Sequence, residues 1–124
     1  MYKKNDNKSL GILGEDKASK FLSKNGYKIL RRNYKCRYGE IDIIARKKKC
    51  IAFIEVKLRS KNSFGGPKSA VGKAKQNKIV YSALNFIKET SLKPEEISFD
   101  VIAILVDGKI EHIKNAFLPN RFSY

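Results

Sequence analysis

The sequence predicts an α/β sandwich, in which a mixed sheet of about five strands is flanked by helices in the order α-β-β-β-α-β-β. Two helical patterns of apolar residues and several short segments rich in β-branched residues predict this order. A length of 124 residues suits one domain with one core. We therefore expect a single domain over 1–124, with residues 1–8 flexible.

The first helix is expected from about Ser9, a capping residue, to Asn25, where the Asn-Gly pair at 25–26 ends it. Its apolar positions recur at threes and fours: Leu10, Leu13, Ala18, Phe21 and Leu22. The segment 27–34 predicts a strand, and 36–40 a turn. Residues 40–46 and 50–58 predict a hairpin around the basic turn 47–49.

A polar, glycine-rich loop is expected at 59–69, either as a substrate-contacting loop or as a plain connection. A long helix follows from about Lys68 to Glu89. Its expected apolar face consists of Val71, Ala74, Val80, Tyr81, Leu84 and Ile87. Strands are then expected at 98–106 and 109–117, joined by a turn at Asp107-Gly108.

The charge balance indicates a polyanionic partner. Lys and Arg number 27 against 12 acids, which gives a net charge of +15. Nucleic acid is favoured over a membrane surface, because no long segment opposes a basic face to an apolar one. The alternative is that a lysine-rich proteome produced a basic protein without such a partner. We expect a cytoplasmic location and no membrane partner, because neither a spanning segment nor a signal peptide is evident.

The two cysteines do not indicate a zinc site. Cys36 and Cys50 are not spaced as a CxxC pair, and the single histidine, His112, is distant in sequence. Zinc sites generally need four nitrogen or sulfur ligands. Reduced thiols are therefore the preferred interpretation.

Charged residues interrupt the most hydrophobic part of the chain. Residues two apart in a strand share a face, so Glu40 and Asp42 should lie opposite Ile41 and Ile43. In the next strand, Glu55 and Lys57 should share a face with Ile51 and Phe53, opposite Ala52, Ile54, Val56 and Leu58. Pairing of the two strands would bring Asp42 close to Glu55, with Lys57 one step along.

Two neighbouring carboxylates beside a lysine suit metal-dependent phosphodiester hydrolysis. Mg²⁺ prefers carboxylate oxygens, and a lysine can orient water or stabilise charge on phosphorus. Glu15 falls on one helical stripe with Ala18 and Leu22, from which it could reach the same site. The structural alternative is an ion pair between Glu55 and Lys57, with Asp42 paired to Arg46 or Arg59.

The sequence resembles the YraN family of small bacterial proteins over about residues 9–118, through GEDKASKFLSKNGY, GEIDIIA, FIEVK and GGPKSAVGKAKQ. The resemblance implies a restriction-endonuclease-like fold of the PD-(D/E)xK nuclease superfamily, close to the archaeal Holliday-junction resolvases. Asp42 matches the acid of that pattern, and Glu55-Val56-Lys57 matches (D/E)-x-K. Glu15 matches the helix glutamate of the resolvase-like branch. Ile41 stands where the pattern has proline, a position at which the superfamily often lacks it.

Together these features predict a metal-dependent endonuclease acting on structured DNA, including branched junctions. Asp42, Glu55 and Glu15 would hold Mg²⁺ or Mn²⁺, and Lys57 would position the attacking water. The expected nucleic-acid contacts are Lys47, Lys48, Lys49, Arg59, Lys61, Lys68, Lys73 and Gln76.

Two expectations about partners stay open at this point. The runner-up function is a nucleic-acid-binding protein, without catalysis or only weakly catalytic, and RNA is an alternative ligand to DNA. The resemblance also implies a homodimer, for which the apolar C-terminal segment 116–124 is a candidate surface.

Overall fold

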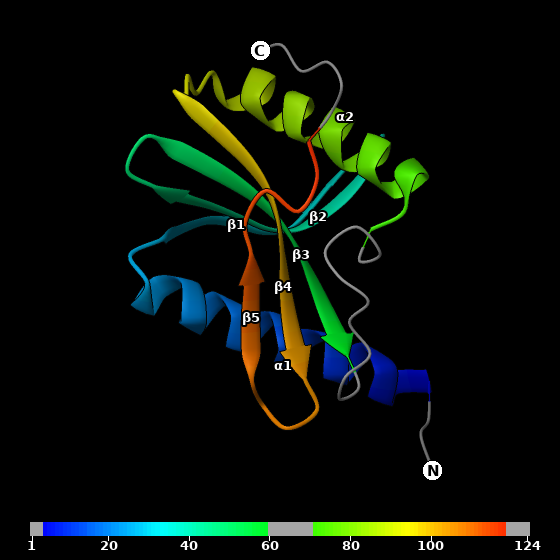
Figure 1. Cartoon of the computed structure of the whole chain (residues 1–124). Coiled ribbons are helices and arrows are strands. Elements are labelled where there is room, and N and C mark those ends of the chain that lie inside the picture. Colours follow the sequence, from blue (N-terminus) through cyan, green and yellow to red (C-terminus); the bar gives the residue numbers. More distant parts are fainter. Residues whose placement is uncertain (1–3, 60–70, 119–124) are drawn as a thin grey trace.

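The computed structural model describes residues 4–59 and 71–118, with side chains in the first helix from Gly11 onward. Within these ranges the elements follow the predicted order, and the α/β sandwich with a mixed sheet is confirmed (Figure 1). The elements are α1 Lys4–Lys24, β1 Lys28–Cys36, β2 Gly39–Lys47, β3 Cys50–Arg59, α2 Lys73–Thr90, β4 Glu96–Leu105 and β5 Ile110–Ile113.

The sheet has the spatial order β1-β2-β3-β4-β5, in which each strand pairs with its neighbour in sequence. Three of these pairings are antiparallel, whereas β3 and β4 run parallel from Cys50↔Glu96 to Arg59↔Leu105. Parallel strands need a long crossover, and α2 lies within the connection between β3 and β4. This crossover brings α2 onto the sheet.

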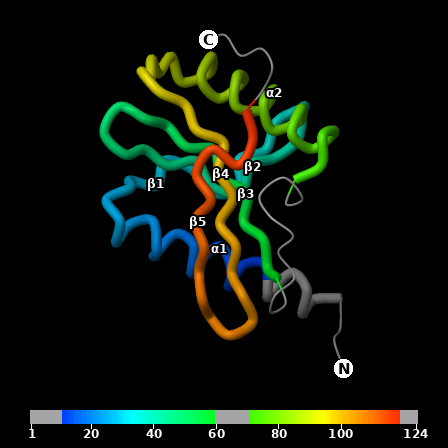
Figure 2. The backbone as a smooth tube through the Cα atoms, viewed as in Figure 1, coloured from blue at the N-terminus to red at the C-terminus, as the bar shows by residue number. Residues whose placement is uncertain are grey.

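The two helices cover opposite faces of the sheet, as the backbone trace shows (Figure 2). Side chains therefore pack into two cores. The core beneath α2 includes Ile51, Phe53, Phe86 and Phe99, and the core beneath α1 includes Leu22, Ala52, Ile54 and Ile102. The alternation along β3 between these cores is the one predicted from its sequence.

Helix α1 differs from the prediction at its start and on its exposed side. It begins at Lys4, so Ser9 lies inside the helix and does not cap it. Leu13 was expected on the apolar face but is 56% exposed. Gly14 faces the sheet instead, where an added Cβ would come within 3.3 Å of the Leu58 Cδ2 atom. The missing side chain lets α1 approach β3 closely.

Strand β5 ends at Ile113, four residues before its expected end at 117. The chain after Ile113 is hydrogen-bonded to the side chain of a buried aspartate. Asp100 is 1% exposed, and its carboxylate accepts a hydrogen bond from the backbone N–H of Asn115 at 3.1 Å. The same carboxylate contacts the Ser98 hydroxyl and lies 2.7 Å from His112 Nε2. Asn115 has a φ of 52°, which turns the chain out of the strand.

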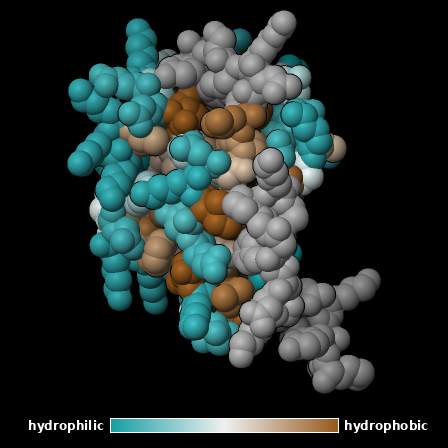
Figure 3. Space-filling view, in the orientation of Figure 1, coloured by the Kyte–Doolittle hydropathy of each residue, from teal (hydrophilic) through white to brown (hydrophobic). Residues whose placement is uncertain are grey.

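Figure 3 shows hydrophilic side chains along the left and at the upper right of the viewed face, with hydrophobic ones running down its middle. Neither α1 nor α2, the helices of the described ranges, combines the length and apolar character that a membrane crossing requires.

Two leucines of α1 provide a matched test of this packing. Leu22→Ala removes a side chain that is 0% exposed and should lower the free energy of unfolding by about 2–5 kcal/mol. Leu13→Ala makes the same change at an exposed position and should alter it by about 0.5 kcal/mol or less. Urea unfolding followed by circular dichroism measures both. Equal losses would contradict the orientation of α1.

Candidate functional site

The sheet splits between β2 and β3. Their registered pairs run from Lys47↔Cys50 to Ile43↔Ile54, and β3 continues beyond this point to Arg59. Just past the split, the Asp42 Oδ2 atom accepts a hydrogen bond of 2.8 Å from the Val56 backbone N–H. A side chain thus satisfies a backbone donor that a continuing ladder would have paired.

Strand β2 changes face at Asp42. Ile41 packs in the core beneath α2, whereas Ile43 packs in the core beneath α1. The prediction that both isoleucines share one face is therefore wrong. Strict alternation holds only for a regular strand, and β2 leaves its pairing with β3 at this position.

The start of β2 is fixed against α2. Gly39 has a φ of 148°, in the region that favours glycine, and an added Cβ would lie 3.5 Å from the Lys78 Cβ atom. The β1–β2 hairpin thus packs against α2 next to the position where β2 and β3 separate.

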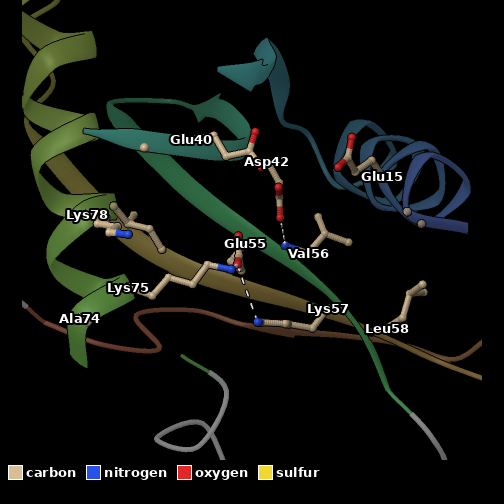
Figure 4. A pocket seen from close by; sticks show the side chains of 14 residues that line it. Glu15, Glu40, Asp42, Glu55, Val56, Lys57, Leu58, Ala74, Lys75 and Lys78 are labelled. Carbon is tan, nitrogen blue, oxygen red and sulfur yellow. Dashed lines mark hydrogen bonds and ion pairs between the residues drawn. The ribbon is translucent and has the colours of Figure 1, made fainter. Parts of the chain in front are cut away.

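A cavity of about 640 Å³ opens at the split. Its walls come from α1, β2, β3 and α2, so that groups from both faces of the sheet meet there (Figure 4). The lining residues are Gly11, Gly14, Glu15, Gly39, Glu40, Asp42, Glu55, Val56, Lys57, Leu58, Ala74, Lys75, Lys78 and Ile79.

The predicted pair of acids does come together in this cavity. Glu55 is 5% exposed, and its carboxylate adjoins that of Asp42. Burial raises the pKa of Asp42 to about 8, assisted by the hydrogen bond and negative charge of Glu55 and opposed by the Val56 N–H. At neutral pH a proton held by Asp42 therefore compensates part of the buried negative charge.

Two lysines supply positive charge to the same pair. Lys57 Nζ lies 3.7 Å from Glu55 Oε2, and Lys75 Nζ pairs with that same oxygen. Burial and the charge of Lys75 lower the pKa of Lys57. Burial alone would lower the pKa of Lys75, but its hydrogen bond and charge interaction with Glu55 raise it. The expected Glu55–Lys57 ion pair is present, and both cations compete for one oxygen.

Glu15 reaches the cavity from α1 but is held at its edge. Its Oε1 atom accepts a hydrogen bond of 2.9 Å from Asn33 Nδ2 and lies 3.9 Å from an Arg32 nitrogen. Its charge contributes to the raised pKa of Asp42. Within the described ranges, however, no three His, Cys, Asp or Glu side chains are grouped to hold a metal ion. The three predicted acids share a cavity without forming a three-residue ligand set.

The sequence prediction missed Lys75 because it left out one buried stripe of α2. Its expected core positions Val80 and Ile87 are buried, as predicted. Tyr81, expected on the apolar face, is 55% exposed, whereas the omitted Ile79, Ala83 and Phe86 are buried. Helical residues four apart share a face, so this buried stripe continues from Ile79 to Lys75. Extending the correct stripe by one turn would have identified the lysine.

The basic turn 47–49 lies far from the acids. Lys47 lies five positions after Asp42 on β2, a span of roughly 17 Å. With Lys114, the three lysines line another cavity, of about 680 Å³. Lys49 pairs there with Glu95 at 3.4 Å, and Lys47 Nζ lies 5.3 Å from the centre of the Tyr27 ring.

The remaining predicted nucleic-acid contacts are placed differently from one another. Arg59 is close enough to Lys57 for its charge to lower the pKa of that lysine. Neither Lys73 nor Gln76 is among the described lining residues, and the Gln76 side chain donates to the Val71 carbonyl at 2.9 Å. Lys61, Lys68 and the loop 59–69 beyond Arg59 lie outside the described residues, as does the C-terminal segment from 119 onward.

Comparisons with known proteins identify relatives along nearly the whole chain. The model of a family described as "Uncharacterised protein family UPF0102" matches residues 14–104. A UPF0102 protein of Syntrophomonas wolfei is 46% identical over 114 residues, covering 90% of this chain and 99% of the relative. A UPF0102 protein of Dictyoglomus turgidum is 44% identical over 117 residues, covering 94% and 99%. One of Clostridium perfringens is 50% identical over 98 residues, covering 79% and 80%.

The raised pKa of Asp42 predicts a pH-dependent stability in EDTA. Between the ordinary value of 3.8 and the folded value of about 8, the native state retains a proton that the unfolded chain releases. The wild type should therefore lose stability as pH rises through this window. Asp42→Asn can still accept the Val56 hydrogen bond but cannot ionise. Its stability relative to the wild type should rise by roughly 2–5 kcal/mol from about pH 4 to about pH 8.

Urea unfolding at a series of pH values measures this difference. Asp107→Asn is the matched control, because exposed Asp107 also accepts one backbone hydrogen bond, from Lys109 at 3.0 Å. Its stability relative to the wild type should change little across the same range. Parallel curves for the wild type and Asp42→Asn would contradict the raised pKa.

Proposed function

Because this chain belongs to the uncharacterised protein family UPF0102, we propose its function from the geometry of its own site. The proposed function is that of a metal-dependent endonuclease, which hydrolyses phosphodiester bonds in structured DNA, including branched DNA. The observation that carries the proposal is the pairing of Asp42 with Glu55 in an open cavity, with the Lys57 amine 3.7 Å from Glu55. The resemblance to PD-(D/E)xK nucleases, through Asp42 and Glu55-Val56-Lys57, supports the same chemistry.

The donor chemistry of the cavity fits a divalent cation. Two adjoining carboxyl groups offer the hard oxygen ligands that Mg²⁺ and Mn²⁺ prefer. Asp42 binds a proton up to about pH 8, and a cation bound there would take the place of that proton. In this proposal Asp42 and Glu55 hold the ion directly, and Glu15 acts through a water molecule. The bound cation would acidify a water molecule and polarise the phosphodiester.

The lysines of the cavity have different proposed roles in the reaction. Lys57 has a lowered pKa, which suits a group that orients the attacking water and exchanges a proton with it. Lys75 and Lys78 line the same cavity from α2, and their charges would oppose the charge that develops on the phosphate. Entry of the cation requires Lys75 to release the Glu55 oxygen, which then leaves Lys75 free to meet the substrate.

The charge of the chain supports a nucleic-acid substrate. A net charge of +15 attracts polyanions, and lysines lie both at the cavity and at the turn 47–49. A DNA backbone that follows β2 from the cavity to the turn would cross roughly 17 Å, about five nucleotides at B-form spacing. Such contacts position the DNA without reading its sequence.

A second candidate function is nucleic-acid binding without cleavage. It is favoured by the charge compensation at Glu55, whose carboxylate already pairs with Lys75 and Lys57. Under this alternative the acids hold lysines in place for phosphate contacts, and metal ions are not required. RNA is a ligand of the same chemistry for both functions.

The main test is cleavage of a panel of single-stranded, duplex, flap and four-way-junction DNA, with Mn²⁺ or with EDTA. The wild type should cut in Mn²⁺ alone, and Mn²⁺ should raise its melting temperature, because the ion binds the folded state. Asp42→Asn should lose both effects while retaining DNA binding. Gel electrophoresis of labelled DNA and thermal unfolding measure them.

Glu111→Gln serves as the matched control, because it removes one exposed carboxylate on β5. This variant should behave as the wild type does. Binding without cutting, by the wild type and by Asp42→Asn in either additive, would reject the endonuclease and select the second candidate. Cleavage by both Asp42→Asn and Glu55→Gln would show that the site is wrong.

Mutation of the two lysines that pair with Glu55 should affect cleavage and Mn²⁺ affinity differently. Lys57→Met should reduce cleavage by about 10²-fold or more and keep the Mn²⁺-dependent rise in melting temperature, because its proposed role is in the reaction. Lys75→Met removes the competing cation and should increase Mn²⁺ affinity by about tenfold, the equivalent of ~1.4 kcal/mol. Mn²⁺ titrations followed by thermal unfolding measure both. The opposite pattern would exchange the roles assigned to the two lysines.

A further inference from the structure

Three planar side chains contact one another in turn on the surface next to the cavity. The Arg37 guanidinium lies 4.8 Å from the centre of the Tyr38 ring, and one of its nitrogens donates to the Tyr38 hydroxyl at 2.6 Å. The Tyr38 ring in turn lies 5.8 Å from that of Tyr81, with 36° between their planes. Arg37 thus contacts Tyr38, and the tilted Tyr38 ring contacts Tyr81. We call these three side chains the stack.

The stack ends on an open ring. Tyr81 is 55% exposed, although it belongs to a helix whose other large aromatic residue, Phe86, is buried. The exposure of Tyr81 leaves ring surface available to a ligand.

Both elements that carry the stack are also walls of the cavity. Tyr38 directly precedes Gly39 and Glu40, and Tyr81 lies one helical turn after Lys78. Gly39, Glu40 and Lys78 all line the cavity. Tyr38 lies in the turn just before β2 and is four positions from Asp42, which is at most about 13 Å of extended chain.

The charges around the stack favour a polyanion. Arg37 belongs to the stack itself, and Lys78 stands on the same side of α2. Glu40 lines the cavity beside the stack, and its register partner across the β1–β2 hairpin is the cationic Lys35. A strand whose phosphate occupies the cavity could therefore extend along the stack.

We propose that Tyr81, supported by Tyr38 and Arg37, is a stacking platform for an unpaired nucleobase of the nucleic acid bound at the cavity. Aromatic side chains bind the faces of unpaired bases, whereas paired bases in a duplex already stack on one another. The platform would engage a base within about four nucleotides of the phosphate in the cavity. It rests on the proposed function for its ligand, and it narrows the substrate class to nucleic acids with an unpaired segment beside the bound phosphate.

The test compares binding of a labelled single-stranded oligonucleotide with binding of its fully paired duplex, in EDTA, by fluorescence anisotropy. Tyr81→Ala should weaken single-strand binding by about 5- to 150-fold and change duplex binding little. Tyr81→Phe keeps the ring and should keep the preference. Lys78→Ala should instead weaken both forms similarly and reduce the salt dependence of binding.

A direct readout is available because the chain contains no tryptophan. Tyr81→Trp introduces a single tryptophan, whose emission should change on saturation with the single strand and not with the duplex. This measurement does not depend on the stability of Tyr81→Ala.

The failures of the two proposals are distinguishable. Equal losses for single strand and duplex in Tyr81→Ala, or no loss in either, would overturn the platform. If the wild type nevertheless cleaves DNA in Mn²⁺, the endonuclease proposal is retained and only the stacking platform is rejected. If the wild type binds neither oligonucleotide form, both proposals fail.

Discussion

The hydrogen bond from the Val56 N–H to the Asp42 carboxylate is the contact on which the site depends. It lies where β2 and β3 separate, and it satisfies a backbone donor that an uninterrupted sheet would have paired with another strand. Because the strands part there, Glu15 can approach from the α1 side and Lys75 from the α2 side. In an unbroken sheet these residues would be separated by the thickness of the sheet itself.

The second constraint is charge compensation. Two carboxyl groups with little access to solvent cannot both remain ionised without partners, and three kinds of positive charge are available to them. Asp42, whose pKa burial raises to about 8, holds a proton, and two lysines pair with Glu55. In the proposed metal-dependent function, a metal ion would replace the proton and one lysine. The metal-dependent and metal-free functions therefore use one arrangement of acids and differ in which cation balances it.

The sequence was sufficient for the regular parts of the molecule. Strand β3 alternates without interruption, so its pattern correctly placed Glu55 and Lys57 beside Phe53 and opposite Ile54. The same rule failed at Asp42, because β2 changes face there, and no local pattern marks where two strands cease to pair. On helix α2 the pattern correctly placed Val80 and Ile87 in the core, but it wrongly counted Tyr81 as a core residue. Tyrosine has both apolar and polar parts, so its exposure depends on tertiary contacts that the sequence does not reveal.

The sequence separation of the site residues has a consequence for folding. Asp42 and Val56 belong to one hairpin and are 14 positions apart, so their contact closes a short loop. Lys75 reaches the same place only when α2 has docked, and α2 lies in the crossover that joins β3 to its parallel neighbour β4. Non-local pairing of this kind is slow compared with hairpin formation. Until the crossover forms, the acids of the hairpin lack their cation from α2. We therefore expect the charge balance to be completed late in the assembly of the fold.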